Sequence, residues 1–138
     1  MPIILQTSLA SPGNDPSILI SNVDCDPSVT VGSWVRMNTS NTLVLAKADS
    51  LSNSNVLGLV ESKQGSTKAT VRTSGISTAI FSGLDVTKEY FLKDSVAGEM
   101  VVQTGVLPTA PGSVILVLGK PLTASRFLVR IGTRIVRS

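Results

Sequence analysis

The chain has 138 residues, a formal net charge of +3, only 15% charged residues, no histidine and a single cysteine. This composition excludes Ser-His-Asp and Cys-His catalytic systems, histidine-ligated metals and a disulfide framework. Serine, threonine and β-branched residues are abundant instead, which indicates one weakly charged, β-rich domain.

The first 28 residues are expected to form an extended arm. Four of the seven prolines lie here. Proline fixes its own φ and biases the preceding residue toward extended backbone, so no helix is expected. Two short strands are predicted within the arm, at residues 3–5 and 18–23. The arm also carries three aspartates, Asp15, Asp24 and Asp26, and no basic residue.

Residues 29–138 are predicted to form an all-β domain, either a small β-barrel or a β-sandwich, with a short C-terminal strand. Apolar runs bounded by turn residues recur about every 8–12 residues, which is typical of these two architectures. Strands are expected near residues 34–37, 42–46, 56–61, 69–73, 77–82, 90–92, 100–103, 114–118 and 127–131. The segment 46–55 is rich in serine and asparagine and is expected to be a loop.

Alternation along the strands indicates which side chains form the core. Phe127 and Val129 alternate with Arg126 and Arg130, so the apolar pair is expected inside and the arginines outside. The run 114–118 is apolar throughout, which predicts a strand that is covered on both faces. The second face of this strand is covered either by another subunit or by another part of the same chain.

The charges are distributed unevenly along the chain. After Glu99 there is no acidic residue, whereas lysine and arginine continue to the C-terminus. Two copies would therefore place an acidic arm against a basic tail; alternatively, one chain folds its own termini together. The candidate subunit-interface residues are the apolar anchors of the arm and the C-terminal arginines: Ile3, Ile4, Leu5, Ile18, Ile20, Arg126, Arg130, Arg134 and Arg137.

No pattern of residues indicates catalysis, a cofactor or a metal, so we expect a protein that is not an enzyme. The densest carboxylate group, Asp85, Glu89 and Asp94, alternates with lysines as a solvated surface does. Nucleic acid is not an expected partner, because the C-terminal arginines alternate with apolar residues and lack an aromatic platform. Nor is a membrane, because no apolar run approaches the ~18 residues that a spanning helix needs.

A second pattern consists of turn glycines and strand hydrophobes. Its parts are Val31-Gly32-Ser33-Trp34-Val35, Leu57-Gly58-Leu59-Val60, Gly83-Leu84-Asp85, Lys88-Glu89-Tyr90-Phe91-Leu92, Gly98, Pro111-Gly112-Ser113-Val114, Val117-Leu118-Gly119-Lys120-Pro121-Leu122 and Phe127-Leu128-Val129. The pattern resembles a small β-module that recurs in virion proteins of tailed bacteriophages, among them head and tail fibres and capsid decoration proteins.

The resemblance implies a structural component of a tailed-phage virion that is synthesised in the host cytoplasm. A capsid decoration protein, acting through contacts with capsid or tail proteins, is the leading expectation, and the resemblance also implies a homotrimer. The main alternative is a fibre or a receptor- or carbohydrate-binding module, for which Trp34 or Tyr90 would supply the stacking surface. A small barrel that binds an apolar ligand is a third class, to which no residue pattern points.

Overall fold

The computed structural model describes residues 17–138, and this part of the chain is all-β with no helix. Its strands are β2 (Ile18–Asp24), β3 (Trp34–Met37), β4 (Leu43–Leu45), β5 (Gly58–Lys63), β6 (Lys68–Ile76), β7 (Tyr90–Leu92), β8 (Met100–Val102), β9 (Val114–Ile115), β10 (Val117–Pro121), β11 (Phe127–Val129) and β12 (Ile135–Val136). The expected all-β class is therefore confirmed.

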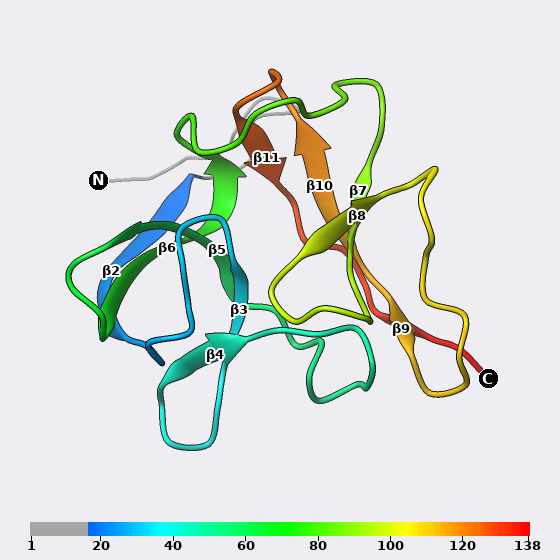
Figure 1. Cartoon of the computed structure of the whole chain (residues 1–138), viewed down its shortest axis with the longest axis horizontal. Coiled ribbons are helices and arrows are strands. Elements are labelled where there is room, and N and C mark those ends of the chain that lie inside the picture. The colour runs from blue at the N-terminus through cyan, green and yellow to red at the C-terminus, as the bar shows by residue number, and fades with distance from the viewer. Residues whose placement is uncertain (1–16) are drawn as a thin grey trace, which may run out of the picture.

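Most of the strands belong to one antiparallel sheet that curls into a half-barrel (Figure 1). Its order is β4-β3-β5-β6-β11-β10-β7-β8; β2 is added to β6, and β12 pairs separately with β9. Backbone hydrogen bonds connect the two ends of the curl. Trp34 N donates to Gly98 O at 2.9 Å, and Ala48 N donates to Lys93 O at 2.9 Å. The β3–β4 end thus contacts the turn between β7 and β8.

Local signals located most of the strands. The strand expected at 114–118 is divided into β9 and the start of β10. The strand expected at 77–82 is a loop, because β6 ends at Ile76. Ser77 causes the change: its N donates to Phe127 O at 2.8 Å, and its Oγ accepts from Phe127 N at 3.0 Å. The Ser77 hydroxyl thus accepts the bond from Phe127 N that a backbone carbonyl would accept in a regular ladder. The chain leaves the sheet at this point.

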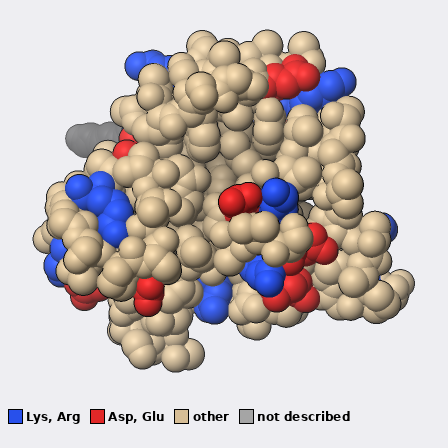
Figure 2. Space-filling view, in the orientation of Figure 1, with Lys and Arg blue, Asp and Glu red and all other residues tan. Residues whose placement is uncertain are grey.

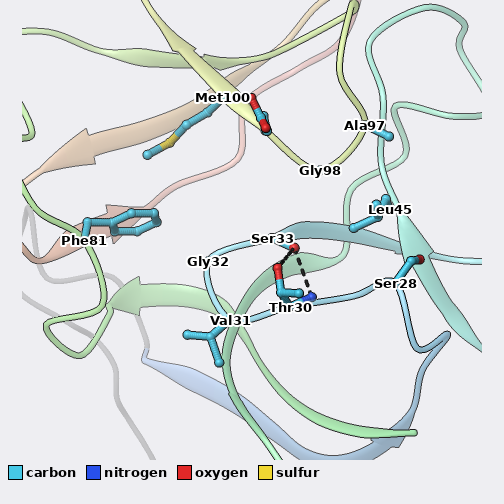
Figure 3. Close-up of a pocket in the computed structure, with 11 residues that line it drawn as sticks. Ser28, Thr30, Val31, Gly32, Ser33, Leu45, Phe81, Ala97, Gly98 and Met100 are labelled. Carbon is cyan, nitrogen blue, oxygen red and sulfur yellow. Dashed lines mark hydrogen bonds between the residues drawn. The ribbon is translucent and has the colours of Figure 1, made fainter. Parts of the chain in front are cut away.

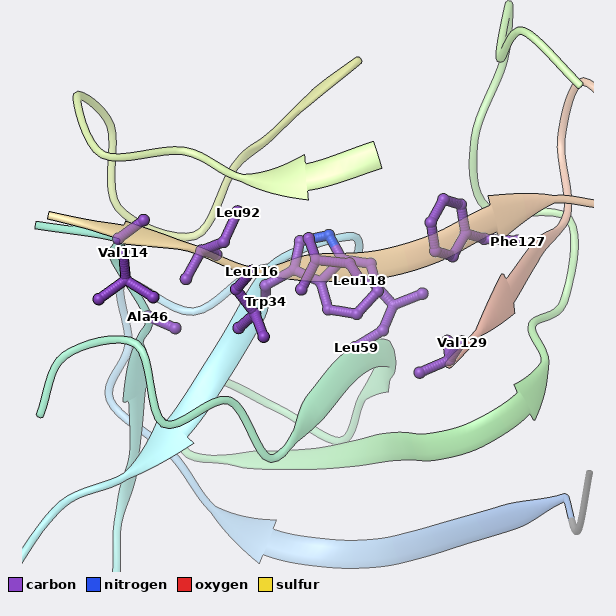
Figure 4. Close-up of a cluster of buried hydrophobic side chains, with 10 residues drawn as sticks. Trp34, Ala46, Leu59, Leu92, Val114, Leu116, Leu118, Phe127 and Val129 are labelled. Atoms are coloured by element: carbon purple, nitrogen blue, oxygen red, sulfur yellow. The ribbon is translucent and has the colours of Figure 1, made fainter. Parts of the chain in front are cut away.

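The main hydrophobic core fills the concave side of the sheet (Figure 4). Phe127 lies at its centre, with edge-to-face ring contacts to Trp34 at 5.4 Å, Tyr90 at 5.9 Å and Phe81 at 6.1 Å between centroids. The remaining buried members are aliphatic: Ala46, Ala48, Leu59, Leu92, Val114, Leu116, Leu118 and Val129. Burial of Phe127 and Val129 beside exposed Arg126 and Arg130 agrees with the alternation in the sequence.

A second core covers the opposite face of β3 and β5. Trp34 belongs to the first core and its neighbour Val35 to the second. Cys25 and Val29, in the segment before β3, cover this face together with side chains of β4, β5 and β6. The same chain therefore buries both faces of these strands.

The run 114–118 is also covered by its own chain. Val114, Leu116 and Leu118 are buried in the first core, whereas the alternate residues are half-buried. Ile115 pairs with Ile135 of the C-terminal β12. A tail of the same chain thus lies against this strand.

The sheet begins inside the segment that was expected to be an arm. β2 pairs with β6, with Ile18 opposite Ser74 and Asp24 opposite Lys68. β6 is the longest strand, and β2 satisfies backbone groups along the edge that β5 leaves open. Residues 18–24 therefore join the sheet of their own chain, and the expected boundary between 28 and 29 is not a boundary of the sheet. Ile3, Ile4 and Leu5 lie outside the described residues.

Candidate interaction surfaces

The strand β2 begins with three consecutive exposed apolar residues, which we call the β2 strip: Ile18, Leu19 and Ile20. Their side chains are 48%, 45% and 39% exposed. β6 is the only strand that pairs with β2 within residues 17–138, so the other edge of β2 has no strand partner there (Figure 1, blue). Natural edge strands are usually protected by charge, proline or a cover. Within residues 17–138, no charge, proline or paired strand protects the three apolar positions of the β2 strip.

Polar contacts fix β2 onto the sheet. Asp24 forms an ion pair with Lys68 at one end of the strand, and Ser17 Oγ accepts a hydrogen bond from Arg72 at the other. Arg72 also forms an ion pair with Glu61 of β5, and both side chains are largely buried. The strip is therefore held in place by its ends, while its apolar side chains remain exposed.

The described acidic residues of the N-terminal segment have partners close by. Asp24 pairs with Lys68 of its own chain rather than with a C-terminal arginine. The Asp26 carboxylate accepts hydrogen bonds from the backbone N of Ser28 at 2.9 Å and from Ser28 Oγ at 2.8 Å. These bonds, the backbone one first, lower the pKa of Asp26 below its ordinary value. Asp15 lies outside the described residues.

Two of the C-terminal arginines anchor the tail of the same chain. Arg134 donates to Leu51 O at 2.6 Å, and Arg137 Nε donates to Pro108 O at 3.1 Å. β2 and the C-terminus lie at opposite ends of the long axis (Figure 1). The described acidic segment and the basic tail of one chain therefore do not meet.

Both proposed stacking surfaces for a sugar belong to the core. Trp34 has no exposed surface, which removes it as a platform. Tyr90 is half-buried against Phe127, and its hydroxyl accepts a hydrogen bond from Asp85 N at 3.0 Å. The sequence did not show this burial because aromatic residues serve cores and sugar sites equally well.

A pocket of about 330 Å³ lies between the segment 28–33 and the turn before β8 (Figure 3). Phe81 and Met100 lie on one side of it, and Thr30 and Ser33 on the other. Thr30 N donates to Ser33 Oγ at 3.2 Å, and the two hydroxyl oxygens are 3.0 Å apart. The pocket thus combines one half-buried aromatic ring with hydroxyl groups. Phe81 was not singled out from the sequence. An aromatic residue within a segment rich in serine and glycine could have indicated a ligand-binding role.

The expected surface carboxylates have ordinary surface contacts. Asp85 accepts from Thr87 Oγ1 at 2.6 Å and from Thr87 N at 3.0 Å, and these bonds lower its pKa, the side-chain bond most. On the face shown in Figure 2, acidic and basic side chains lie in small mixed groups. Within residues 17–138, no cluster of three or more acidic or cysteine side chains is suited to a metal ion.

No helix in the described part of the chain is long and apolar enough to span a membrane. Comparison of the chain with protein-family models, with characterised proteins and with solved structures finds no match.

Proposed function

We propose that this protein is a structural component of a tailed-phage virion, and that it decorates or stabilises the capsid through protein–protein contacts. The observation that carries the proposal is the β2 strip, three consecutive large apolar side chains on a sheet edge without a strand partner in residues 17–138. The resemblance of residues 29–131 to the β-module of phage virion proteins is the reason for proposing a virion as the location. A homotrimer that docks as a unit is the expected form.

The β2 strip suits binding to a protein surface for an energetic reason. Full burial of one such side chain is worth ~1.5–3 kcal/mol, and these three are already about half buried. Their backbone is already ordered in the sheet, so little further conformational entropy is lost on docking. The edge of β2, which has no strand partner within residues 17–138, also offers backbone hydrogen bonds to an extended segment of a partner.

Localisation in purified particles tests the proposal. Particles from density gradients are labelled with an antibody to this protein, and we expect a regular array of label over the head. Label confined to a fibre supports the alternative. Absence of the protein from intact particles contradicts both.

A pair of variants tests the β2 strip itself. We expect the double variant Ile18→Lys/Ile20→Lys to lower the number of copies per particle at least about tenfold, because two lysines would have to be desolvated at the contact. The matched control is Val86→Lys/Val106→Lys, which places the same charges at exposed apolar positions outside the strip. Equal occupancy of the two variants would show that the strip is not the contact.

The alternative, a carbohydrate-binding module of a fibre, is favoured by one observation, the pocket beside Phe81. A half-buried ring next to hydroxyl groups is a usual arrangement for a sugar. Binding on a glycan array that is lost in Phe81→Ala would favour this function over capsid decoration.

A further inference from the structure

A second groove, of about 680 Å³, lies between the β3–β4 hairpin, the loop 50–55 and the C-terminal tail. Two arginines line it, Arg36 from β3 and Arg134 from the tail. They are 98 residues apart in the sequence, and folding brings them to one site. We propose that this groove binds an acidic peptide segment, with its carboxylates on Arg36 and Arg134. The inference does not depend on where in a virion the protein resides.

The arginines retain capacity to bind an anion. Neither forms an ion pair with a carboxylate of residues 17–138. Arg36 Nε is buried with no hydrogen-bond partner in this part of the chain, so a ligand in the groove would bind the terminal nitrogens of Arg36; Arg134 uses one nitrogen on Leu51 O. Each guanidinium carries five N–H donors in a fork that matches a carboxylate. Two such forks in one groove favour a ligand that carries at least two negative groups.

The acidic residue next to the groove loop in the sequence, Asp49, has other partners. Asp49 precedes the groove loop, and its carboxylate is occupied by Lys47 at 3.8 Å and by Asn53 Nδ2 at 3.0 Å. Asp49 is not among the residues that line the groove. Among the described residues that line the groove, the two arginines are charged and none is acidic.

The rest of the lining favours a peptide over a sugar. Met37 and Leu51 are 39% and 49% exposed, and they suit the aliphatic side chains of a peptide. No aromatic ring lines the groove, whereas sugar sites usually stack their ligand on one. The remaining side chains are amides and hydroxyls that can bond a peptide backbone: Asn38, Thr39, Ser50, Ser52 and Asn55.

Titration of the full-length protein, followed by amide NMR shifts, tests the proposal. The probe is a short blocked peptide of alternating glutamate and leucine, and its control replaces each glutamate by glutamine. We expect shifts near residues 36–39 and 50–55 with the glutamate peptide only, and weaker binding at high salt. Equal shifts with the glutamine peptide, shifts elsewhere, or no shifts would overturn the proposal.

Matched variants then test whether Arg36 and Arg134 bind the carboxylates of the peptide. Arg134→Gln is expected to weaken binding about two- to fivefold, the effect of one lost exposed charge pair. Arg126→Gln makes the same charge change at an exposed position outside the groove and should bind as the wild type does. Arg36→Lys keeps the charge but loses the fork, and it should bind more weakly. Equal affinities of Arg134→Gln and Arg126→Gln would overturn the assignment.

Other anions serve as competitors in the same titration. Inorganic phosphate and a sulfated polysaccharide are each added to the peptide complex. We expect phosphate to compete only weakly, because it offers no aliphatic groups to Met37 and Leu51. Tighter binding of the polysaccharide than of the peptide at the same residues would replace the peptide assignment by a sulfated glycan.

Discussion

At the scale of single residues, Gly119 is the position that most restricts the fold. Its φ is +144°, and a Cβ there would lie 2.0 Å from Leu128 O and 3.0 Å from Arg130 N. Both atoms belong to the backbone around β11, so neither can move without disturbing the β10–β11 ladder. The close approach of these two strands thus requires a residue without a side chain.

We predict that Gly119→Ala destabilises the protein far more than Gly83→Ala does. Gly83 also has a positive φ, +68°, but a Cβ at this position would have no atom within 4 Å. Gly83→Ala should therefore cost only the left-handed backbone strain, about 1–2 kcal/mol. Gly119→Ala should add ~1–3 kcal/mol of overpacking. Urea unfolding at neutral pH measures the loss of stability in each variant. Equal losses would contradict the close approach of β10 to β11 at Gly119.

At the scale of the elements, the contact between β5 and β6 depends on a polar pair. Glu61 of β5 and Arg72 of β6 form an ion pair with side chains only 6% and 11% exposed. Arg72 also reaches Ser17 at the start of β2, and Thr78 Oγ1 donates to Glu61 at 3.5 Å. One buried guanidinium thus links three strands.

We predict that Arg72→Met lowers the free energy of unfolding by about 3–5 kcal/mol, because it leaves the Glu61 carboxylate buried without its partner. The double variant Glu61→Met/Arg72→Met should recover most of this loss, since both charges are then removed. Chemical denaturation of the two variants provides the measurement. If the double variant is as unstable as the single one, the cost comes from lost packing and not from the unpaired charge.

At the scale of the whole molecule, one curled sheet has cores on both of its faces. The concave core contains Trp34 and Phe127, and the outer core contains Cys25, Val35 and Val60. Because the same chain covers both faces of β3 and β5, association does not need those faces. The β2 strip and the groove of Arg36 and Arg134 lie outside both cores, and they are the surfaces that we propose for partners.

We predict that deletion of residues 1–24 gives a less stable protein than deletion of residues 1–16. The two variants differ by residues 17–24, which contain all of β2. The longer deletion removes β2, its ion pair from Asp24 to Lys68, and Val23, which packs against the outer core. The loss should be roughly 1 kcal/mol, because Val23 is only partly buried and full burial of a valine is worth about 1.5 kcal/mol. Thermal melts followed by circular dichroism measure it, and equal melting temperatures would show that β2 contributes nothing to stability.

Much of the local structure could be predicted from the sequence. Turn residues and β-branched runs located β3 and β7 to the residue, and the alternation of Phe127 and Val129 with two arginines gave the correct buried face. These features depend on neighbours in the chain, through backbone preferences and the two-residue period of a strand. The loop at 46–55 follows from its composition for the same reason.

Only the tertiary structure decided which distant segments meet. It paired β2 with β6 and the C-terminal tail with β9. From the sequence, each of these segments could equally have packed against another subunit. It buried Trp34, and it brought Arg36 and Arg134 to one groove. Strand pairing and side-chain exposure depend on what covers each edge and face, and residues far apart in the chain supply that cover. No local pattern contains this information, because the same apolar run serves a core or an exposed edge equally well.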